Sequence, residues 1–326
     1  MRALGKWLGR LLLGLVAAGS LLFFLGPYEP VKTEVSFDPA RFEGGVQAYF
    51  ERTESAYEDL REGVEKRVIW AGEPEARTAV SVLYVHGFSA TSEEIRPVPD
   101  RVAQALGANL VFTRLAGHGR SGAAMAEPSA GDWMEDTAEA LAAAKAVGEE
   151  VIVLSTSTGG TLVALALLDP VMREGVKGVV FVSPNFGIND PMAWVLTLPA
   201  ARQFVPLIAG DQRAWGAVNA LQEKYWSTRY PTVAVLPMAA LVREAWRRDY
   251  QAVTVPALFH YDRGDQVVEA AQTERFLQGW GGAVSQVVLP AEAVVEESRH
   301  VIMGDIVAPA QTEAAIDMIL NWVNSL

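Results

Sequence analysis

A serine with the surroundings of a nucleophile stands between a predicted strand and a predicted helix. The apolar run 151–154 is rich in β-branched residues, which is typical of a buried strand, and the apolar run 161–168 predicts a helix. A sharp turn from strand to helix needs small residues two positions before and after the serine at its apex. Ser155 and Gly159 flank Ser157 in this way. The alternative is a plain Ser/Thr-rich loop, so the hypothesis depends on partner residues elsewhere.

A serine hydroxyl is a weak nucleophile near neutral pH and needs an adjacent base, for which imidazole is well suited. The chain has 4 histidines, so each can be considered in turn. His86 precedes the serine and could shape its own loop, His118 lies in a glycine-flanked turn, and His260 falls within a predicted strand. His300 follows the last predicted strand and precedes the last predicted helix. We predict that His300 is the base, with a surface loop histidine as the alternative.

Two aspartates could orient that imidazole. Asp262 and Asp265 both follow the predicted strand 255–261, and spacing alone leaves the choice between them open. The resulting chain order of serine, acid and histidine is that of nucleophile-elbow enzymes, not that of the chymotrypsin or subtilisin types. By the same logic the backbone N–H of Thr158, directly after the serine, is a predicted donor to an oxyanion.

These residues come together if the predicted strands form one sheet. Strands alternate with helices along most of the chain, which predicts a mainly parallel, doubly wound α/β sheet. The predicted strands cover 68–70, 79–85, 109–115, 151–154, 178–184, 255–261 and 285–289, and the predicted helices cover 41–55, 93–106, 133–147, 161–168 and 310–323. Ligands bind at the carboxyl ends of the strands in such sheets, which is where the loops with the candidate residues fall.

Residues of about 185–252 interrupt this alternation. They hold several tryptophans on apparently helical fragments without strand periodicity, and they are too many for a plain connection. We predict a helical cap over the carboxyl edge of the sheet. Trp194 and Trp215, together with His86, are candidates to line a substrate pocket. The alternative is that the tryptophans only pack the cap against the core.

The composition excludes several classes of function. The chain has 326 residues, of which 50% are hydrophobic and 20% charged, as expected for a globular domain. A net charge of −12 argues against nucleic acid as a partner. The chain has no cysteines, which rules out disulfides and thiolate metal sites, and the scattered histidines lack ligand spacing. Since no phosphate-cradling motif is present either, we predict no metal and no cofactor.

The N-terminus predicts a membrane anchor. Residues 7–26 are apolar and about 30 Å long as a helix, enough to cross a hydrocarbon core. Lys6 and Arg10 lie at its start and acidic residues follow it, which places the N-terminus in the cytoplasm and the remainder across the membrane, periplasmic if the source is bacterial. A cleaved signal peptide, giving a secreted protein, and a buried or interfacial helix are the alternatives. The predicted division is 1–26 anchor or signal, 27–60 linker and helix, and 61–326 catalytic domain with the cap.

The motifs together resemble the α/β-hydrolase superfamily, nearest its monoacylglycerol lipase and carboxylesterase-like branch. The resemblance runs from about residue 65 to the end. The motifs that carry it are His86-Gly87, Gly117-His118-Gly119-Arg120-Ser121, the Ser157 elbow, Gly264-Asp265-Gln266-Val267-Val268 and Ser298-Arg299-His300-Val301. Ser155 departs from the family pattern, because it replaces the first glycine of G-x-S-x-G.

The resemblance implies further roles. It assigns the acid to Asp265 and the second oxyanion donor to the backbone N–H of Phe88. The implied function is a serine hydrolase that cleaves carboxylic esters through an acyl-enzyme. The expected substrate is acyl-glycerol or lysolipid-like with an apolar acyl group, and the membrane is the expected partner. Two alternatives stay open: a non-catalytic envelope scaffold, motivated by Ser155, and an amidase or acyltransferase with the same triad.

Overall fold

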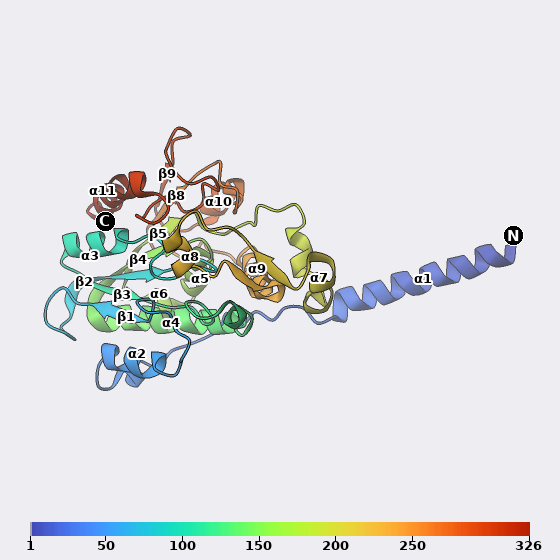
Figure 1. Cartoon of the computed structure of the whole chain (residues 1–326), viewed down its shortest axis with the longest axis horizontal. Coiled ribbons are helices and arrows are strands. Elements are labelled where there is room, and N and C mark those ends of the chain that lie inside the picture. Colours follow the sequence, from blue (N-terminus) through green and yellow to red (C-terminus); the bar gives the residue numbers. More distant parts are fainter. Residues whose placement is uncertain (1) are drawn as a thin grey trace.

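The computed structural model describes residues 2–326, with side chains from residue 6 onward. The first helix, α1 (Arg2–Leu25), projects away from the rest of the molecule, as Figure 1 shows. Within the described residues, one helical stretch, Lys6–Leu25, is long and apolar enough to cross a membrane, and none of it is buried. All the remaining elements belong to the globular part.

A seven-stranded sheet forms the centre, in the order β1-β3-β2-β4-β5-β8-β9. Its strands are β1 (Arg67–Ile69), β2 (Thr78–Val85), β3 (Asn109–Phe112), β4 (Gly148–Thr156), β5 (Val176–Val182), β8 (Ala257–Tyr261) and β9 (Val284–Val288). In the described part of the chain the neighbouring strands run parallel, except that β1 is antiparallel to β3. Each of the seven predicted strands is found, and the predicted fold class is confirmed.

Helices cover both faces of the sheet, because its central strands are apolar on both sides. One face packs against α3 (Val98–Leu106) and α11 (Thr312–Val323). The other packs against α4 (Ala130–Val147), α5 (Thr158–Ala166) and α10 (Ala270–Phe276), and α9 (Val235–Ala245) packs on α4 and α5. In β4, Val151 to Leu154 are all fully buried. The strand that leads to the elbow serine is therefore paired on both edges and covered on both faces, which fixes its position.

The short connecting elements complete the fold. They are η2 (Gly122–Ala126), α6 (Pro170–Arg173), η5 (Leu277–Gly279) and η6 (Pro309–Gln311). The predicted helix 93–106 begins later than expected, at Val98. Proline disfavours helical backbone in the residue before it and is favoured in the first turn, so Pro97 and Pro99 set the start of α3. The residues before Pro97 consequently stay in the loop that follows β2.

The predicted helix 41–55 is two helices, η1 (Pro39–Phe42) and α2 (Val46–Glu54). Gly44 and Gly45 have φ values of 91° and 107°, which interrupt a right-handed helix. Phe42 and Phe50 are buried in the main core, so the segment predicted as a linker packs against the domain. Glu54 accepts hydrogen bonds from Arg114 Nε and Nη2 at 2.7 and 2.8 Å, which fix the segment further.

The cap contains helices and a small sheet. Its elements are η3 (Ala193–Thr197), α7 (Ala201–Ala209), β6 (Gln212–Ala214), α8 (Ala220–Tyr225), β7 (Arg229–Pro231) and η4 (Thr232–Ala234), followed by α9. The antiparallel pair β6–β7 differs from the predicted all-helical character. Strands of three residues are too short to show an alternating pattern, which is why the sequence does not reveal them.

Candidate active site

Ser157 lies at the apex of the turn between β4 and α5. Its backbone has φ 52° and ψ −120°, a conformation that a non-glycine residue rarely adopts. The Ser157 N–H donates to the Val182 carbonyl at 3.0 Å, which ties the apex to β5. A Cβ on Gly159 would lie 2.3 Å from the Val85 carbonyl oxygen, so only glycine fits at this position of the turn. The geometry is that of a nucleophile elbow.

Ser155 occupies the position of the missing glycine without disturbing the turn. It is fully buried at the end of β4, and its Oγ donates to the Val180 carbonyl at 3.1 Å. A buried hydroxyl with a hydrogen-bond partner costs little, so this serine is accommodated by β5. The departure from the usual motif therefore leaves the elbow intact.

His300 and Asp265 form a buried pair. His300 Nδ1 lies 2.7 Å from Asp265 Oδ2. The other oxygen, Asp265 Oδ1, accepts the N–H groups of Val267 and Val268 at 2.7 and 2.9 Å. With both of its oxygens engaged, the carboxylate is held in one orientation. The other ring nitrogen, His300 Nε2, has no hydrogen-bond partner from the protein among the described residues.

Asp262, the other candidate acid, points elsewhere. Its Oδ1 accepts the Gly264 N–H at 2.7 Å, and its Oδ2 pairs with Arg299 at 2.5 Å. Asp262 thus shapes the loop after β8, and Asp265 is the aspartate that contacts the imidazole.

The surroundings of His300 favour its protonated form. Burial alone would lower the pKa of His300, but the charge and hydrogen bond of Asp265 raise that pKa above its ordinary value. A raised pKa makes the imidazole a stronger proton acceptor, which is what a general base for a serine hydroxyl requires.

Ser157 and His300 line one cavity of about 600 Å³. Most of the exposed surface of its wall is apolar; the wall also carries three carboxyl groups and includes no Lys or Arg among the described residues. The lining residues are Phe88, Ser89, Glu94, Ser157, Thr158, Asn185, Trp215, Gly216, Val218, Gln222, Trp226, Tyr230, Met238, Gln266, Val267, Glu296, Glu297, Ser298, His300 and Val301. The cavity can therefore hold an apolar group next to a serine and an imidazole.

Of the three residues predicted to line the substrate pocket, the structure brings Trp215 to the cavity. Trp194 is 59% exposed and faces a separate surface hollow beside Trp246. His86 is fully buried, where its Nε2 accepts the Leu115 N–H at 3.1 Å and burial lowers its pKa to about 4. The neutral His86 ring therefore stabilises its own loop through this hydrogen bond. Shaping that loop is the alternative role that its position in the sequence suggested.

The two predicted oxyanion donors lie at the same cavity. Phe88 follows β2 and Thr158 begins α5, and both line the cavity with Ser157. Within the part of the chain that the structure describes, neither backbone N–H donates to a protein acceptor. Two backbone N–H groups without an acceptor beside a serine are the type of donor that forms an oxyanion hole.

Sequence reasoning missed Glu94, a buried carboxyl group at this cavity. It accepts hydrogen bonds from the Gly87 N–H at 2.7 Å and the Tyr84 hydroxyl at 2.8 Å. In the sequence it appears as half of an acidic pair at the expected start of a helix, which is typical of a solvated helix end. The signal that could have identified it is its place in the loop that begins with His86-Gly87, before the prolines that delay α3.

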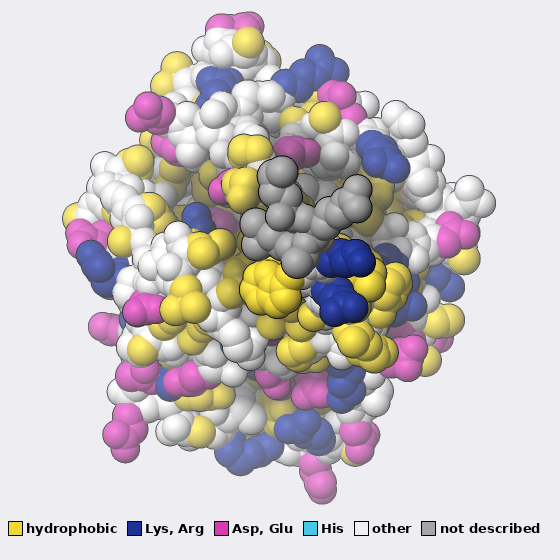
Figure 2. All heavy atoms as spheres, turned by 90° about the vertical axis from the view of Figure 1, so that its right-hand side faces the viewer, with side chains coloured by type: hydrophobic (Ala, Val, Ile, Leu, Met, Phe, Trp, Pro, Cys, Tyr) yellow, Lys and Arg dark blue, Asp and Glu magenta, His cyan; other side chains and the backbone are white. Residues whose placement is uncertain are grey.

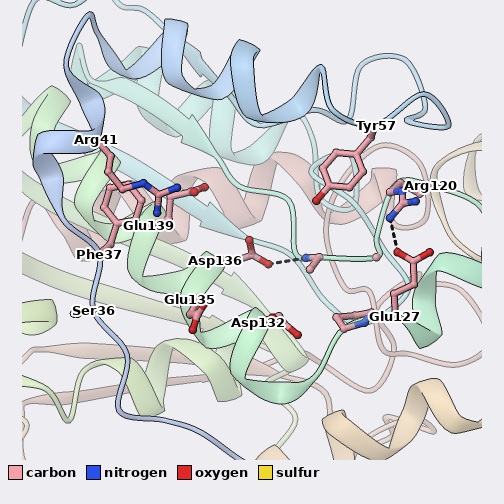
Figure 3. Close-up of a pocket in the computed structure, with 13 residues that line it drawn as sticks. Ser36, Phe37, Arg41, Tyr57, Arg120, Glu127, Asp132, Glu135, Asp136 and Glu139 are labelled. Carbon is pink, nitrogen blue, oxygen red and sulfur yellow. Dashed lines mark hydrogen bonds and ion pairs between the residues drawn. The ribbon is translucent and has the colours of Figure 1, made fainter.

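A second hollow, of about 440 Å³, lies between the N-terminal segment, α4 and the loop that follows β3 (Figure 3). Four of its carboxyl groups come from α4, but they have partners: Asp136 accepts the Ala116 N–H at 2.6 Å, and Lys66 pairs with Asp136 and Glu139. Arg120 pairs with Glu127 across the hollow. Its described lining includes neither a serine–histidine pair nor any candidate catalytic residue, whereas the cavity at Ser157 brings the predicted serine and histidine together.

Comparison with known proteins places this geometry in a family. Residues 76–306 match the hydrolase family described as serine aminopeptidase, S33. The chain is 25% identical over 238 residues to a thermostable monoacylglycerol lipase from Bacillus sp. (strain H-257), an alignment that covers 73% of this chain and 89% of that protein.

Solved structures share the fold. One of the metagenome-derived lipolytic enzymes described as LipS and LipT is 21% identical, with a TM-score of 0.64 over 82% of this chain and 100% of its own. The monoacylglycerol lipase of Paleococcus ferrophilus is 14% identical, with a TM-score of 0.57 over 80% and 98%. With the elbow, the sheet order and the family match in agreement, the chain belongs to the serine aminopeptidase S33 family of hydrolases and has the α/β-hydrolase fold.

Proposed function

We propose that this hydrolase is a serine esterase that works through an acyl-enzyme. The observation that carries the proposal is the arrangement of Ser157 at the elbow and the His300–Asp265 pair at one cavity. Ser157 Oγ attacks the ester carbonyl while His300 Nε2 takes its proton, and the N–H groups of Phe88 and Thr158 hold the oxyanion. The proton passes to the leaving alcohol. Water then repeats the sequence, releasing the acid and restoring Ser157.

The cavity supports a neutral ester with an apolar acyl group. Most of its exposed surface is apolar, and Trp215, Trp226 and Met238 contribute to it. Its carboxyl groups, without Lys or Arg beside them in the described lining, disfavour an anionic substrate. The relative from Bacillus is named a monoacylglycerol lipase. We therefore propose acyl-glycerols or similar neutral lipids as the substrate class.

The substrates that the enzyme turns over distinguish the proposed esterase from a scaffold, an amidase or an acyltransferase. The full chain in detergent is expected to hydrolyse p-nitrophenyl esters, with an initial burst of about one p-nitrophenol per active site when deacylation is slow. The corresponding p-nitroanilides should react far more slowly, and added alcohols should not divert the acyl group. No ester turnover would favour the non-catalytic scaffold, whereas dominant amide cleavage or acyl transfer would favour an amidase or an acyltransferase.

We propose that α1 anchors the enzyme in a membrane, with 27–60 joining it to the hydrolase domain 61–326 and its cap at about 185–252. The cap holds the base of α1: the Ala200 N–H donates to the Pro27 carbonyl at 2.8 Å and Arg202 Nε to Glu29 at 2.8 Å. Next to it, α7 exposes 83% of Leu207 and 67% of Ile208. Figure 2 looks onto this end, where hydrophobic side chains lie among charged ones. An apolar rim at the root of a spanning helix fits a lipid surface.

An uncleaved anchor makes the protein resist extraction. The full chain is expected to stay with membranes in alkaline carbonate and to retain Met1 or Arg2 as its first residue by mass spectrometry. Because the chain has no cysteines, Val294→Cys, at a 71% exposed site, gives a single thiol that reports orientation. An impermeant maleimide should label it in intact cells without permeabilisation. Release of a shortened chain would instead indicate a cleaved signal peptide.

A further inference from the structure

The catalytic cavity contains an acid that the proposed triad does not use. Glu94 is only 2% exposed, and its Oε2 already accepts two hydrogen bonds, from the Gly87 N–H and the Tyr84 hydroxyl. The Tyr84 hydroxyl also lies 3.0 Å from Thr156 Oγ1, next to the nucleophile. Glu94 is thus linked both to the loop that carries the Phe88 N–H and to the end of β4.

The second oxygen of this carboxyl group lies near the nucleophile. A Cβ placed on Gly87 would lie 2.9 Å from Glu94 Oε1 and 3.1 Å from Ser157 Cβ, so the two side chains are separated by little more than that glycine. Oε1 has no hydrogen-bond donor from the protein among the described residues, and Glu94 lines the cavity. This oxygen is therefore available to a substrate bound at Ser157.

Burial, without a Lys or Arg partner in the described lining of the cavity, disfavours an ionised Glu94 carboxylate. The groups that face Glu94 are His300 and Tyr84. Glu296 and Glu297 line the same cavity, and its described lining includes no Lys or Arg. Burial raises the pKa of Glu94, which the hydrogen bonds from Gly87 and Tyr84 and the nearby His300 only partly offset. An anion here would also repel the oxyanion that forms on the substrate.

We propose that Glu94 works as a neutral carboxylic acid whose Oε1–H donates a hydrogen bond on the oxyanion side of Ser157. Since Oε2 accepts two hydrogen bonds, the proton resides on Oε1. The inference rests on the proposed serine esterase mechanism and adds a third donor to the two backbone N–H groups. No bond to Glu94 forms or breaks. When Glu94 ionises, the donor is lost and a repelling charge takes its place.

The test compares Glu94→Gln and Glu94→Ala with Glu93→Gln as the matched control. Glu93 is the neighbouring acid, but it pairs with Arg67 and Arg96. Loss of one oxyanion donor typically costs roughly 10²-fold in kcat, which is the effect expected for Glu94→Ala. Glutamine keeps a neutral donor and an acceptor, so Glu94→Gln should retain activity to within about an order of magnitude of wild type. The control should match wild type.

The pH profile gives the sharper readout. Wild-type kcat/KM should fall at high pH as Glu94 loses its proton, and Glu94→Gln should remove that fall while keeping the acid limb set by His300. If Glu94 is ionised instead, it supports the His300 imidazolium, and Glu94→Gln would move the acid limb to lower pH and leave the alkaline side unchanged. That result, or equal damage from Gln and Ala, would overturn the proposal.

An infrared measurement tests the protonation state without relying on turnover. The difference spectrum of wild type and Glu94→Gln at neutral pH should contain the C=O stretch of one protonated carboxyl group. Its absence, with a carboxylate band in its place, would overturn the proposal. Labelling of wild type by a fluorophosphonate keeps the two proposals apart: an unlabelled wild type refutes the serine mechanism, whereas a labelled wild type with an ionised Glu94 refutes only this inference.

Discussion

Replacing Ser157 by alanine is expected to lower kcat for ester hydrolysis by roughly 10⁶-fold, and replacing His300 by alanine should cost about as much. The two act as one unit: without the hydroxyl there is no acyl-enzyme, and without the imidazole the hydroxyl keeps its proton. Both side chains line the same cavity, so neither change should alter the fold. The double variant should be no worse than either single one.

The matched control is Ser155→Ala, in the same turn. Ser155 is buried and its hydroxyl donates to the Val180 carbonyl, away from the cavity lining. Its loss leaves one carbonyl short of a partner, a cost of about 1 kcal/mol in stability, and should leave kcat close to wild type. The measurement is p-nitrophenyl ester hydrolysis by purified, folded variants. If Ser155→Ala were the inactive one, the nucleophile would be wrongly placed.

Asp265→Asn is expected to lower kcat by roughly 10⁴-fold. The carboxylate accepts the His300 Nδ1–H at 2.7 Å, which keeps Nε2 free to accept the serine proton. An amide group in its place can donate to Nδ1 and stabilise the wrong tautomer. Because Asp265 raises the pKa of His300, its removal should also lower that pKa. The base works only when neutral, so the acid limb of kcat/KM should move to lower pH.

Asp262→Asn provides the comparison for the acid. This side chain pairs with Arg299 and the Gly264 N–H, so its replacement should loosen the loop after β8 with little effect on the pH profile. The two variants are compared by kcat and by the position of the acid limb. A larger loss from Asp262→Asn, with an unshifted limb in Asp265→Asn, would contradict the assignment of the acid.

The centre of the sheet was predictable because its central strands are buried on both faces. Runs such as 151–154 consist of consecutive β-branched and aliphatic residues, a pattern that indicates a central parallel strand without any tertiary information. The shorter elements were not predictable in this way. β6 and β7 have three residues each, and their pairing depends on backbone hydrogen bonds within the cap. The break between η1 and α2 depends on the backbone of Gly44 and Gly45.

The residues of the candidate site were likewise only partly predictable from the sequence. Ser157 and His300 were predicted from local pattern and chain order, because each stands at the end of a predicted strand or between predicted elements. The choice of Asp265 over Asp262 came from family resemblance, since spacing alone leaves the choice between them open. Trp194 was predicted to line the substrate pocket but lines a separate hollow, because the sequence does not tell which face of a cap helix points inward. Glu94 was missed because its hydrogen bonds with Tyr84 and Gly87 form only when the loop after β2 folds back on the strand, and the sequence does not show this.

The central claim, that Ser157 is an activated nucleophile, is tested most directly by covalent labelling. A fluorophosphonate reacts with a serine whose hydroxyl is deprotonated by an adjacent base, and peptide mass spectrometry locates the adduct. The account predicts one adduct per chain, on Ser157, absent from Ser157→Ala and strongly slowed in His300→Ala. An adduct on Ser155 or another serine, or equal labelling of wild type and Ser157→Ala, would contradict it.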